Sequence, residues 1–382
     1  MTMTNEHRPK LVCAHYLSNY LTTTMNWLYP ILRSTNTCEP IIFARSTSNL
    51  DSFPMANIYA LSRLTPVNRA FNLVVYKSLG YFPHFRHAGK KHDARLLHVH
   101  MGYDGWKMLP LKRKLGVPMV TGFYGIDASK YPRIPKWRQR YRTLFAEGEC
   151  FLALGPRMRE ALMEAGCPDQ KLKVFNIGIH LEDFPIRSPR MPKGDEILIV
   201  MGASFREKKG IPYALEAVAI LRKRFPRVKL LIAGDGELRQ QIEQQRNSLG
   251  LSQNVDLPGY VPPHSFRKLM ESAHIVILPS VTAPDGDTEG TPYVLFEALA
   301  MGIPVVSTYH ADIPEVVTDG VSGYLVPERD SAALAERLIH LIEHPESWST
   351  MGKAGREHVA RHFNAATQFE ALMQLYSGVI GR

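Results

Sequence analysis

The segment from Pro284 to Thr308 reads PDGDTEGTPYVLFEALAMGIPVVST. A short apolar run, His274–Pro279, precedes it, and a second one, Pro304–Thr308, ends it. Both runs have the length and the β-branched composition of buried strands. Between them we expect a helix that opens at Pro292, with Thr291 as N-cap, because proline is tolerated at the first helical position. A strand, a helix and a strand in this order predict a parallel βαβ unit.

The same alternation continues outward over the rest of the chain. Helical patterns such as Tyr213–Arg224, Glu237–Ser248 and Ser331–Glu343 separate the apolar runs. Alternation of this kind predicts parallel sheets with helices on both faces. We expect twelve strands, in two sets of six: Lys10–His15, Pro40–Ala44, Leu96–His100, Pro118–Gly122, Cys150–Leu154 and Lys173–Asn176, then Glu196–Gly202, Val228–Ala233, Asn254–Leu257, His274–Pro279, Pro304–Thr308 and Gly323–Val326.

The two sets of strands predict two doubly wound, Rossmann-like α/β domains. A Pro-rich stretch around Pro185, Pro189 and Pro192 lies between them. We therefore place the first domain at residues 1–188 and the second at 189–364. The last helical pattern, 365–380, has its own apolar face and is expected to pack back on the first domain. Because ligands bind such sheets at the carboxyl ends of the strands, the cleft between the two domains is the expected site.

Composition excludes several other classes of protein. The chain has 382 residues, of which 45% are hydrophobic and 21% charged, which is typical of soluble globular domains rather than disordered or fibrous chains. Its four cysteines are far apart and contain no C-x-x-C, which argues against a disulfide scaffold or a thiolate zinc site. The first residues are polar and no apolar run approaches the ~20 residues of a membrane span. We therefore expect a cytoplasmic protein.

Positive charge is concentrated in the first half of the chain. Residues 1–190 contain 27 Lys and Arg against 13 Asp and Glu, a net charge of +14, whereas the whole chain has +10. In Lys130–Arg142, six basic residues alternate with Tyr131, Trp137 and Tyr141. This pattern fits an interface with an anionic membrane, stacking on single-stranded nucleic acid, or a solvated basic face over core aromatics. We favour the membrane, on the inner face of the cytoplasmic membrane, and expect no nucleic acid.

Two carboxylates flank the start of the helix at Pro292. The free N–H groups and the dipole of a helix N-terminus can hold a diphosphate. Glu289 lies just before this helix, and Glu297 lies within it among apolar neighbours. A carboxylate in apolar surroundings is unusual unless it has a binding partner, and hydrogen bonds from two ribose hydroxyls would provide one. An ordinary surface glutamate on an amphipathic helix is the alternative.

The Glu289/Glu297 pair, followed by ALAMGIPVV, resembles the Glu-x7-Glu motif of the family-four retaining glycosyltransferases, which have the two-domain GT-B fold. Further segments resemble landmarks of that family: FREKKG at 205–210, LIAGDGEL at 231–238, residues 259–262, KLKVFNIGIHLEDF at 171–184, residues 97–102 and residues 121–127. The resemblance covers nearly the whole chain and is strongest over 171–327.

The resemblance implies roles for individual residues. Glu289 would contact hydroxyls of the donor sugar and Glu297 the ribose. Lys209 matches the lysine that neutralises the departing diphosphate, and Arg206 is the nearest guanidinium to the family's arginine position, where this chain has Ala203 and Ser204. The remaining residues expected to bind the donor are Gly202, Gly290, Thr291, Pro292 and Tyr293.

The first domain departs from the family pattern. Tyr124 stands where many members have a histidine in Thr-Phe-His-Gly-x-Asp, while Asp127 is retained. Tyr124, Asp127 and His100 are the expected contacts to the acceptor or the sugar. We expect His98 and His100 to point to opposite sides of their strand, a spacing that would not suit one metal ion.

No metal or cofactor is expected to take part in transfer. Asp285-Gly286-Asp287 is similar to the Asp-x-Asp metal motif of another glycosyltransferase fold, but basic residues and the helix dipole already serve the diphosphate. The resemblance thus implies a retaining hexosyltransferase that uses a nucleotide-sugar, UDP in preference to GDP, and we expect it to be metal-independent. Its acceptor would be a saccharide or lipid-linked saccharide of exopolysaccharide or lipopolysaccharide synthesis. The alternatives are a non-catalytic nucleic-acid or membrane scaffold and another GT-B activity such as a phosphorylase.

Overall fold

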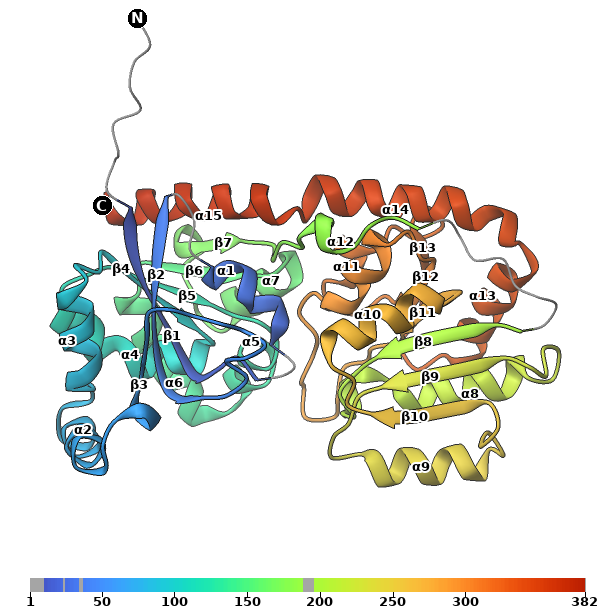
Figure 1. Cartoon of the computed structure of the whole chain (residues 1–382), viewed down its shortest axis with the longest axis horizontal. Helices are drawn as coiled ribbons and strands as arrows, with labels where there is room; N and C mark the ends of the chain where they lie inside the picture. Colours follow the sequence, from blue (N-terminus) through green and yellow to red (C-terminus); the bar gives the residue numbers. More distant parts are fainter. Residues whose placement is uncertain (1–9, 23–24, 34–36, 188–195, 382) are drawn as a thin grey trace, which may run out of the picture. The chain divides into compact units, whose positions relative to one another are not determined.

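A computed structural model describes residues 10–22, 25–33, 37–187 and 196–381 (Figure 1). The chain divides into two compact units. Unit 1 comprises Met1–Ala153, Arg159–Ile177 and Ala366–Arg382, and unit 2 comprises Leu154–Met158 and Gly178–Ala365. The main change of unit therefore falls at 177/178, whereas the boundary predicted at 188/189 lies outside the described residues. The final helix, α15 (Ala365–Ile380), belongs almost wholly to unit 1.

Unit 1 is built on a sheet of seven parallel strands in the order β3-β2-β1-β4-β5-β6-β7. All five residues of β4 are buried, as expected for a parallel strand covered on both faces. The six predicted strands are present, and one further strand, β3, lies at the edge. The strands are β1 (Leu11–Tyr20), β2 (Cys38–Thr47), β3 (Ile58–Ala60), β4 (Leu96–His100), β5 (Met119–Gly122), β6 (Cys150–Ala153) and β7 (Leu172–Val174).

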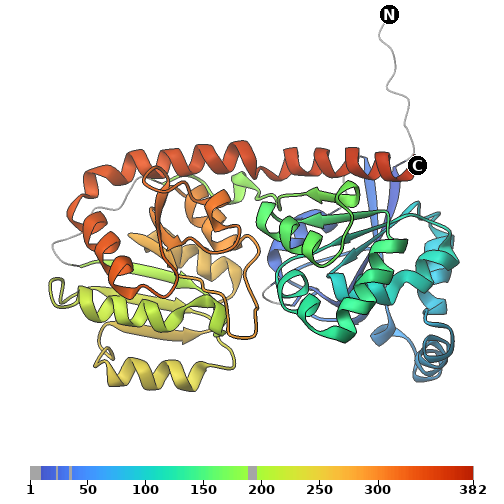
Figure 2. The same ribbon diagram turned by 180° about the vertical axis from the view of Figure 1, so that it is seen from behind.

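Helices lie on both faces of this sheet (Figures 1 and 2). The α-helices are α1 (Tyr29–Leu32), α2 (Pro66–Leu79), α3 (Pro83–Lys91), α4 (Gly102–Leu115), α5 (Ile126–Ser129), α6 (Pro135–Glu147), α15 and α7 (Pro156–Glu164), whose first turn is counted with unit 2. Short 3-10 turns complete the unit: η1 (Asn26–Leu28), η2 (Leu61–Arg63), η3 (Tyr131–Arg133) and η4 (Asp169–Lys171).

Unit 2 has six parallel strands in the order β10-β9-β8-β11-β12-β13, all of them predicted. They are β8 (Leu198–Gly202), β9 (Lys229–Ala233), β10 (Val255–Gly259), β11 (Ile275–Leu278), β12 (Val305–Thr308) and β13 (Gly323–Val326). The helices and 3-10 turns are η5 (Leu181–Asp183), η6 (Glu207–Lys209), α8 (Ile211–Leu221), α9 (Arg239–Ser248), α10 (Pro263–Ser272), α11 (Tyr293–Ala300), α12 (Ile313–Val316), α13 (Ser331–Glu343), η7 (Pro345–Ser347) and α14 (Trp348–His362).

The two sheets confirm the predicted fold class, a pair of doubly wound parallel α/β domains of the GT-B type. In unit 2, β8, β11, β12 and β13 are consecutive neighbours, so the loops that follow them meet at one edge of the sheet. Apolar side chains of β8, β11 and α11 fill the core beneath this edge. Polar side chains in these loops are therefore supported by a packed apolar core. Among the described residues, no helix combines the length and the apolar character needed to cross a bilayer.

Candidate active site

A cluster of charged side chains lies at this carboxyl edge of unit 2. Lys209, at the end of η6, makes an ion pair with Glu289, with Nζ 2.6 Å from Oε1. Its neighbour Lys208 donates to Asp287 Oδ1 and to the carbonyl oxygen of Thr288, each at 3.0 Å. The loop after β8 and the loop after β11 are thus joined by two lysine–carboxylate pairs, with all four charged groups largely buried.

The lysines determine the ionisation of Glu289. Burial by itself would raise the pKa of this carboxyl, but the positive charges of Lys209 and Lys208 outweigh it and hold the pKa at about 2. Glu289 is therefore a carboxylate throughout the physiological range. A carboxylate in this place can accept hydrogen bonds from hydroxyl groups, as the sequence analysis predicts for the donor sugar.

A glycine lets the lysine turn approach the end of β11. Gly210 has a φ of +64°, and a Cβ at this position would lie 1.8 Å from the carbonyl oxygen of Pro279. No other residue type fits such a contact without displacing the backbone. The FREKKG segment, which predicted a phosphate-binding loop, thus places its lysines against the acidic loop because it ends in glycine.

The predicted helix in the Glu-x7-Glu segment is present as α11, but its cap differs from the prediction. The helix begins at Tyr293, Pro292 is the N-cap residue, and no side chain caps the helix. The prediction that Thr291 caps the helix is wrong, because Pro292 takes the cap position itself. The buried Thr291 hydroxyl has no hydrogen-bond partner within the described part of the chain. The first N–H groups of α11 have no partner within the helix either.

Glu297 is on the buried side of α11 and is 8% exposed. Burial raises its pKa to about 8, and the positive charge of Arg267 opposes this rise only in part. The ligand-free protein therefore holds an uncharged carboxyl group here at neutral pH. Arg267 lies on α10, 4.3 Å from the centre of the Phe184 ring, and its Nε has no hydrogen-bond partner in the described ranges. Sequence reasoning did not identify Arg267.

A second residue that the sequence did not reveal is His310, which follows β12. Its Nε2 accepts the backbone N–H of Glu289 at 3.0 Å, and its Nδ1 lies 2.6 Å from Glu328 Oε1. Because Nε2 accepts, the proton is on Nδ1 and is donated to Glu328. Glu328 also accepts from the backbone N–H and the hydroxyl of Thr282, at 2.8 and 3.1 Å. His310 and Glu328 thus fix the loop that carries Glu289.

The other residues predicted for this site lie around the cluster. Arg206 is exposed, and within the described residues its guanidinium forms no ion pair with the acidic loop. Gly202 ends β8, where a Cβ would lie 2.5 Å from the Phe266 ring, and Gly290 is buried beside Glu289. Asp285 Oδ1 accepts the backbone N–H of Asp287 at 3.0 Å. The structure thus groups Lys209, Glu289, Gly290 and the start of α11, and leaves the role of Arg206 a prediction.

In unit 1, the predicted contact residues lie at the ends of two adjacent strands: His100 ends β4, Tyr124 follows β5, and Asp127 is in α5 just after it. Tyr124 follows β5, its hydroxyl lies 2.7 Å from His100 Nδ1, and its ring packs on Trp27 at 4.9 Å between centroids. Asp127 is fully buried, and its two carboxylate oxygens accept backbone N–H groups of Gly102, Tyr124 and Gly125 at 2.7–3.0 Å. Asp127 therefore fastens the loop that carries Tyr124. A direct contact of either residue with a sugar stays a prediction.

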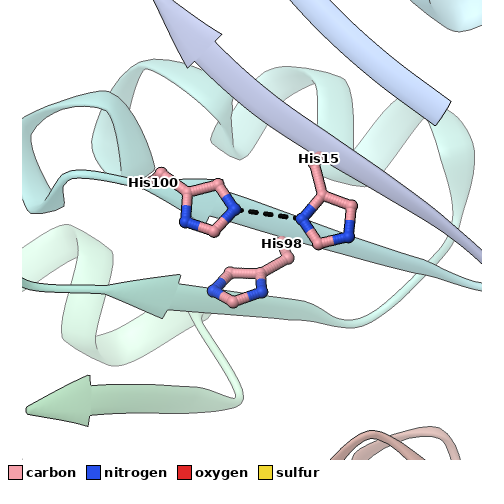
Figure 3. A group of neighbouring side chains, drawn as sticks. All are labelled: His15, His98 and His100. Atoms are coloured by element: carbon pink, nitrogen blue, oxygen red, sulfur yellow. Dashed lines mark hydrogen bonds between the residues drawn. The ribbon is translucent and has the colours of Figure 1, made fainter. Parts of the chain in front are cut away.

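The prediction that His98 and His100 point to opposite sides of β4 is wrong. Their rings lie on the same side, with centroids 4.2 Å apart, and His15 of β1 joins them (Figure 3). Side chains alternate along a strand, so residues two apart share one face. Burial lowers the pKa of all three histidines, that of His15 to about 3.

The aromatic residues of Lys130–Arg142 are less exposed than the sequence suggested. Tyr141 is fully buried on the inner face of α6, where its hydroxyl donates to the carbonyl oxygen of Asp127 at 2.8 Å. The interpretation of Tyr141 as a membrane anchor is therefore wrong, because the helical period turns it toward the sheet. Arg140 lies over the rings of Trp106 and Trp137, at 4.2 and 4.6 Å.

Comparison with known proteins agrees with this architecture. The model of the family "Glycosyltransferase Family 4" matches residues 34–183, and that of "Glycosyl transferases group 1" matches residues 184–358. The glycosyltransferase AmsK of amylovoran biosynthesis from Erwinia amylovora is 34% identical over 289 residues, which are 75% of this chain and 70% of AmsK. WcaL of Salmonella typhimurium, named as a glycosyltransferase of colanic acid biosynthesis, is 37% identical over 271 residues, 70% of this chain and 66% of WcaL. The matched region thus spans about two thirds of these relatives.

Solved structures share the fold over almost the whole chain at low sequence identity. Anabaena HepE in complex with UDP and glucose has a TM-score of 0.76 at 17% identity, covering 96% of this chain and all of HepE. Sucrose-phosphate synthase from Thermosynechococcus elongatus has a TM-score of 0.75 at 19% identity and covers 97% of this chain. Together with the two family models and the Glu-x7-Glu segment at α11, these findings establish that the chain belongs to the family-four glycosyltransferases with the GT-B fold.

Proposed function

We propose that the chain is a retaining hexosyltransferase that moves a sugar from a UDP-sugar to a saccharide or lipid-linked saccharide during exopolysaccharide or lipopolysaccharide synthesis. The observation that carries this proposal is the contact of Lys209 with Glu289 beside the free N-terminus of α11. The two lysines and the helix N-terminus suit a departing diphosphate, and the carboxylate suits sugar hydroxyls. The names of AmsK and WcaL, both of bacterial polysaccharide biosynthesis, support the pathway class.

The transfer step is proposed to need no protein nucleophile. The bond between the sugar's anomeric carbon and the diphosphate oxygen breaks, and its electron pair stays with the diphosphate. The acceptor hydroxyl attacks the same face of the sugar, and its proton passes to a diphosphate oxygen. Lys209, with Arg206, would stabilise the negative charge that develops, and this role requires no divalent cation.

The donor nucleotide can be tested directly by thermal unfolding. Similar proteins are associated with both nucleotides. HepE was solved in complex with UDP, whereas a mannosyltransferase of Mycolicibacterium smegmatis, 26% identical, is named as GDP-mannose-dependent. A ligand that binds only the folded protein raises the midpoint of unfolding. UDP is expected to raise this midpoint more than GDP at equal concentration. A larger effect of GDP would reverse the nucleotide assignment without affecting the transferase assignment.

Turnover separates the proposal from the alternatives. A nucleotide-sugar panel with the purified full chain should show slow donor hydrolysis, which Glu289→Ala lowers and Glu237→Ala, at an exposed position, does not. A scaffold without catalytic activity would hydrolyse no donor. A phosphorylase would instead release sugar phosphate from an oligosaccharide and inorganic phosphate. Either result would refute the proposed transfer.

We further propose that unit 1 binds an anionic membrane surface. Arg133, Arg138 and Arg142 surround a surface hollow of about 350 Å³ on η3 and α6, which suits a lipid phosphate group. Apolar contact would come from α2 and not from Tyr141. Val67, Phe71 and Val74 are spaced four and three residues apart on this helix and are 79%, 58% and 62% exposed. Exposed apolar side chains in a helical stripe are typical of interfacial helices.

Vesicle co-sedimentation tests this binding. The protein should sediment with anionic vesicles at low salt and much less at high salt, because screening acts over about 8–10 Å. A charge variant with Arg133, Lys136, Arg138 and Arg142 replaced by Gln, and an apolar variant with Val67, Phe71 and Val74 replaced by Ser, should each reduce sedimentation and keep nucleotide affinity. If both variants sediment like the parent, the basic charge serves another purpose and a soluble acceptor becomes the better hypothesis.

A further inference from the structure

Three histidines from two adjacent strands form a closed cluster in unit 1. His15 of β1 pairs in register with His98 of β4, and His100 follows two residues later on the same face. One ring nitrogen from each residue lies within 4.8 Å of the others, and His15 Nδ1 and His100 Nε2 share a hydrogen bond of 3.0 Å, which a bound ion would replace (Figure 3). None of the three is more than 1% exposed. Within the described residues, this is the only group of three or more potential metal ligands.

Tyrosine hydroxyls hold the rings of two of these histidines. His98 Nδ1 lies 2.5 Å from the hydroxyl of Tyr376 on α15, and His100 Nδ1 lies 2.7 Å from that of Tyr124. The second nitrogen of His98, Nε2, is buried and has no hydrogen-bond partner in the described part of the chain. A buried polar atom without a hydrogen-bond partner lowers the stability of the folded protein by about 1–3 kcal/mol. We therefore expect His98 Nε2 to have a bound partner.

We propose that His15, His98 and His100 bind one divalent transition-metal ion, with zinc as the expected ion. Imidazole nitrogens suit zinc, whereas magnesium and calcium prefer oxygen ligands. Three histidines leave the fourth position of a tetrahedral ion for a water molecule. The hydroxyls of Tyr124 and Tyr376 would hold the outer nitrogens, as hydrogen-bond acceptors commonly do around metal-binding histidines.

The distances allow such a site after a small adjustment. Zinc–nitrogen bonds of about 2.0–2.1 Å place the nitrogens of a tetrahedral site about 3.3 Å apart. The His15–His100 separation of 3.0 Å is already close to this value. The widest separation, at most 4.8 Å, has to close by no more than about 1.5 Å, which small rotations of the side chains can provide.

This ion would have a structural role separate from the proposed transfer step. It would link β1 and β4 directly, and through Tyr376 it would connect them to α15, the last helix of the chain. It would also fix the ring of His100, to which Tyr124 is hydrogen-bonded. Binding to the folded state alone would stabilise unit 1. The proposal does not depend on the nature of the donor or the acceptor.

The test requires a protein without competing surface sites. Two further histidine pairs, His340/His344 and His358/His362, have ring centroids 4.6 and 4.9 Å apart and could bind zinc on their own. The full chain is therefore prepared without a polyhistidine tag and with His344→Gln and His362→Gln. Bound zinc is measured by elemental analysis after gel filtration. The dissociation constant is then obtained by competition with a coloured chelator.

We expect about one zinc ion per chain in the untagged His344→Gln/His362→Gln protein, and none when His98→Ala is added to it. One cobalt ion bound in place of zinc should give the visible absorption of a tetrahedral site. His98→Ala removes a fully buried side chain and with it core packing, so Tyr376→Phe provides a milder test: it keeps all three ligands and removes one outer hydrogen bond. It should weaken zinc binding roughly 10–100-fold. His264→Ala, at an exposed position, is the matched control.

Two results would overturn the proposal. The first is a folded background protein that contains no zinc above the level of the buffer and whose unfolding midpoint zinc does not change. The second is zinc binding that neither His98→Ala nor Tyr376→Phe weakens, which would place the ion on the surface of the protein.

Discussion

Replacing Glu297 by glutamine is expected to stabilise the ligand-free protein at pH 8 and to leave its stability nearly unchanged at pH 5. Burial raises the pKa of Glu297 to about 8, from an ordinary value of 4.5. The folded protein therefore binds this proton more tightly than the unfolded chain does. The free energy of unfolding falls as the pH rises from about 4.5 to 8, because unfolding then releases a proton. Glutamine has nearly the shape of the protonated acid and has no proton to release.

The size of the effect follows from the two pKa values. Between pH 5 and pH 8, a group with these values lowers the free energy of unfolding by about 3 kcal/mol. In a unit of this size, a change of 3 kcal/mol moves the unfolding midpoint by roughly 6–12 °C. The same variant should bind nucleotide about 1–3 kcal/mol more weakly, since the glutamine amide has one acceptor oxygen where the carboxyl group can offer two to the ribose hydroxyls. A gain in stability combined with a loss of binding is typical of a functional carboxyl group.

Thermal unfolding followed by calorimetry from pH 5 to pH 8 measures this difference. Glu237→Gln, at an exposed position, is the matched control and should unfold like the parent at every pH. Glu289→Gln is a second control: Lys209 and Lys208 hold the pKa of Glu289 at about 2, so its loss should have the same cost at pH 5 and at pH 8. If the difference between parent and Glu297→Gln is equal at both pH values, Glu297 is already ionised in the folded protein and the reasoning fails.

The remaining predictions concern the cluster around Glu289. Lys209→Ala should reduce the rate of transfer about 100-fold or more, because it removes one group that stabilises a developing anion. Lys223→Ala, at an exposed position, should leave the rate unchanged. Arg206→Ala should also reduce turnover, and parental activity in this variant would remove Arg206 from the site. Transfer should survive excess EDTA, and a loss that manganese restores would contradict the metal-independent mechanism. His310→Ala should lower kcat and the unfolding midpoint, because the buried N–H of Glu289 loses its acceptor, while His310→Gln should recover part of both.

The sequence predicted the architecture well, because parallel strands buried on both faces leave continuous apolar runs. All twelve predicted strands are present. The strand that was missed, Ile58–Ala60, has three residues and pairs only at the sheet edge, so its composition carries little signal. The predicted domain boundary at 188/189 lies outside the described residues and stays a prediction.

The candidate site was predictable only where its residues are close in sequence. Glu289, Glu297 and Lys209 lie in motifs with fixed spacing. His310 and Arg267 act on these residues from other loops and helices, and only the folded chain brings them together. The histidine cluster was missed for two reasons: the two-residue period of a strand was applied wrongly to His98 and His100, and His15 lies 83 residues before His98 in the chain.

The lysine–carboxylate pairs make the donor end of unit 2 almost electrically neutral. Two positive charges, on Lys208 and Lys209, are balanced by Asp287 and Glu289, and Glu297 is uncharged at neutral pH. These four paired groups together add no long-range attraction for small anions, so inorganic phosphate and nucleoside triphosphates gain little from the two lysines. A ligand has to displace a carboxylate from its lysine and offer that carboxylate hydroxyl groups in return. Selectivity for a sugar-bearing diphosphate over the other anions of the cell would then follow from this pairing of charges.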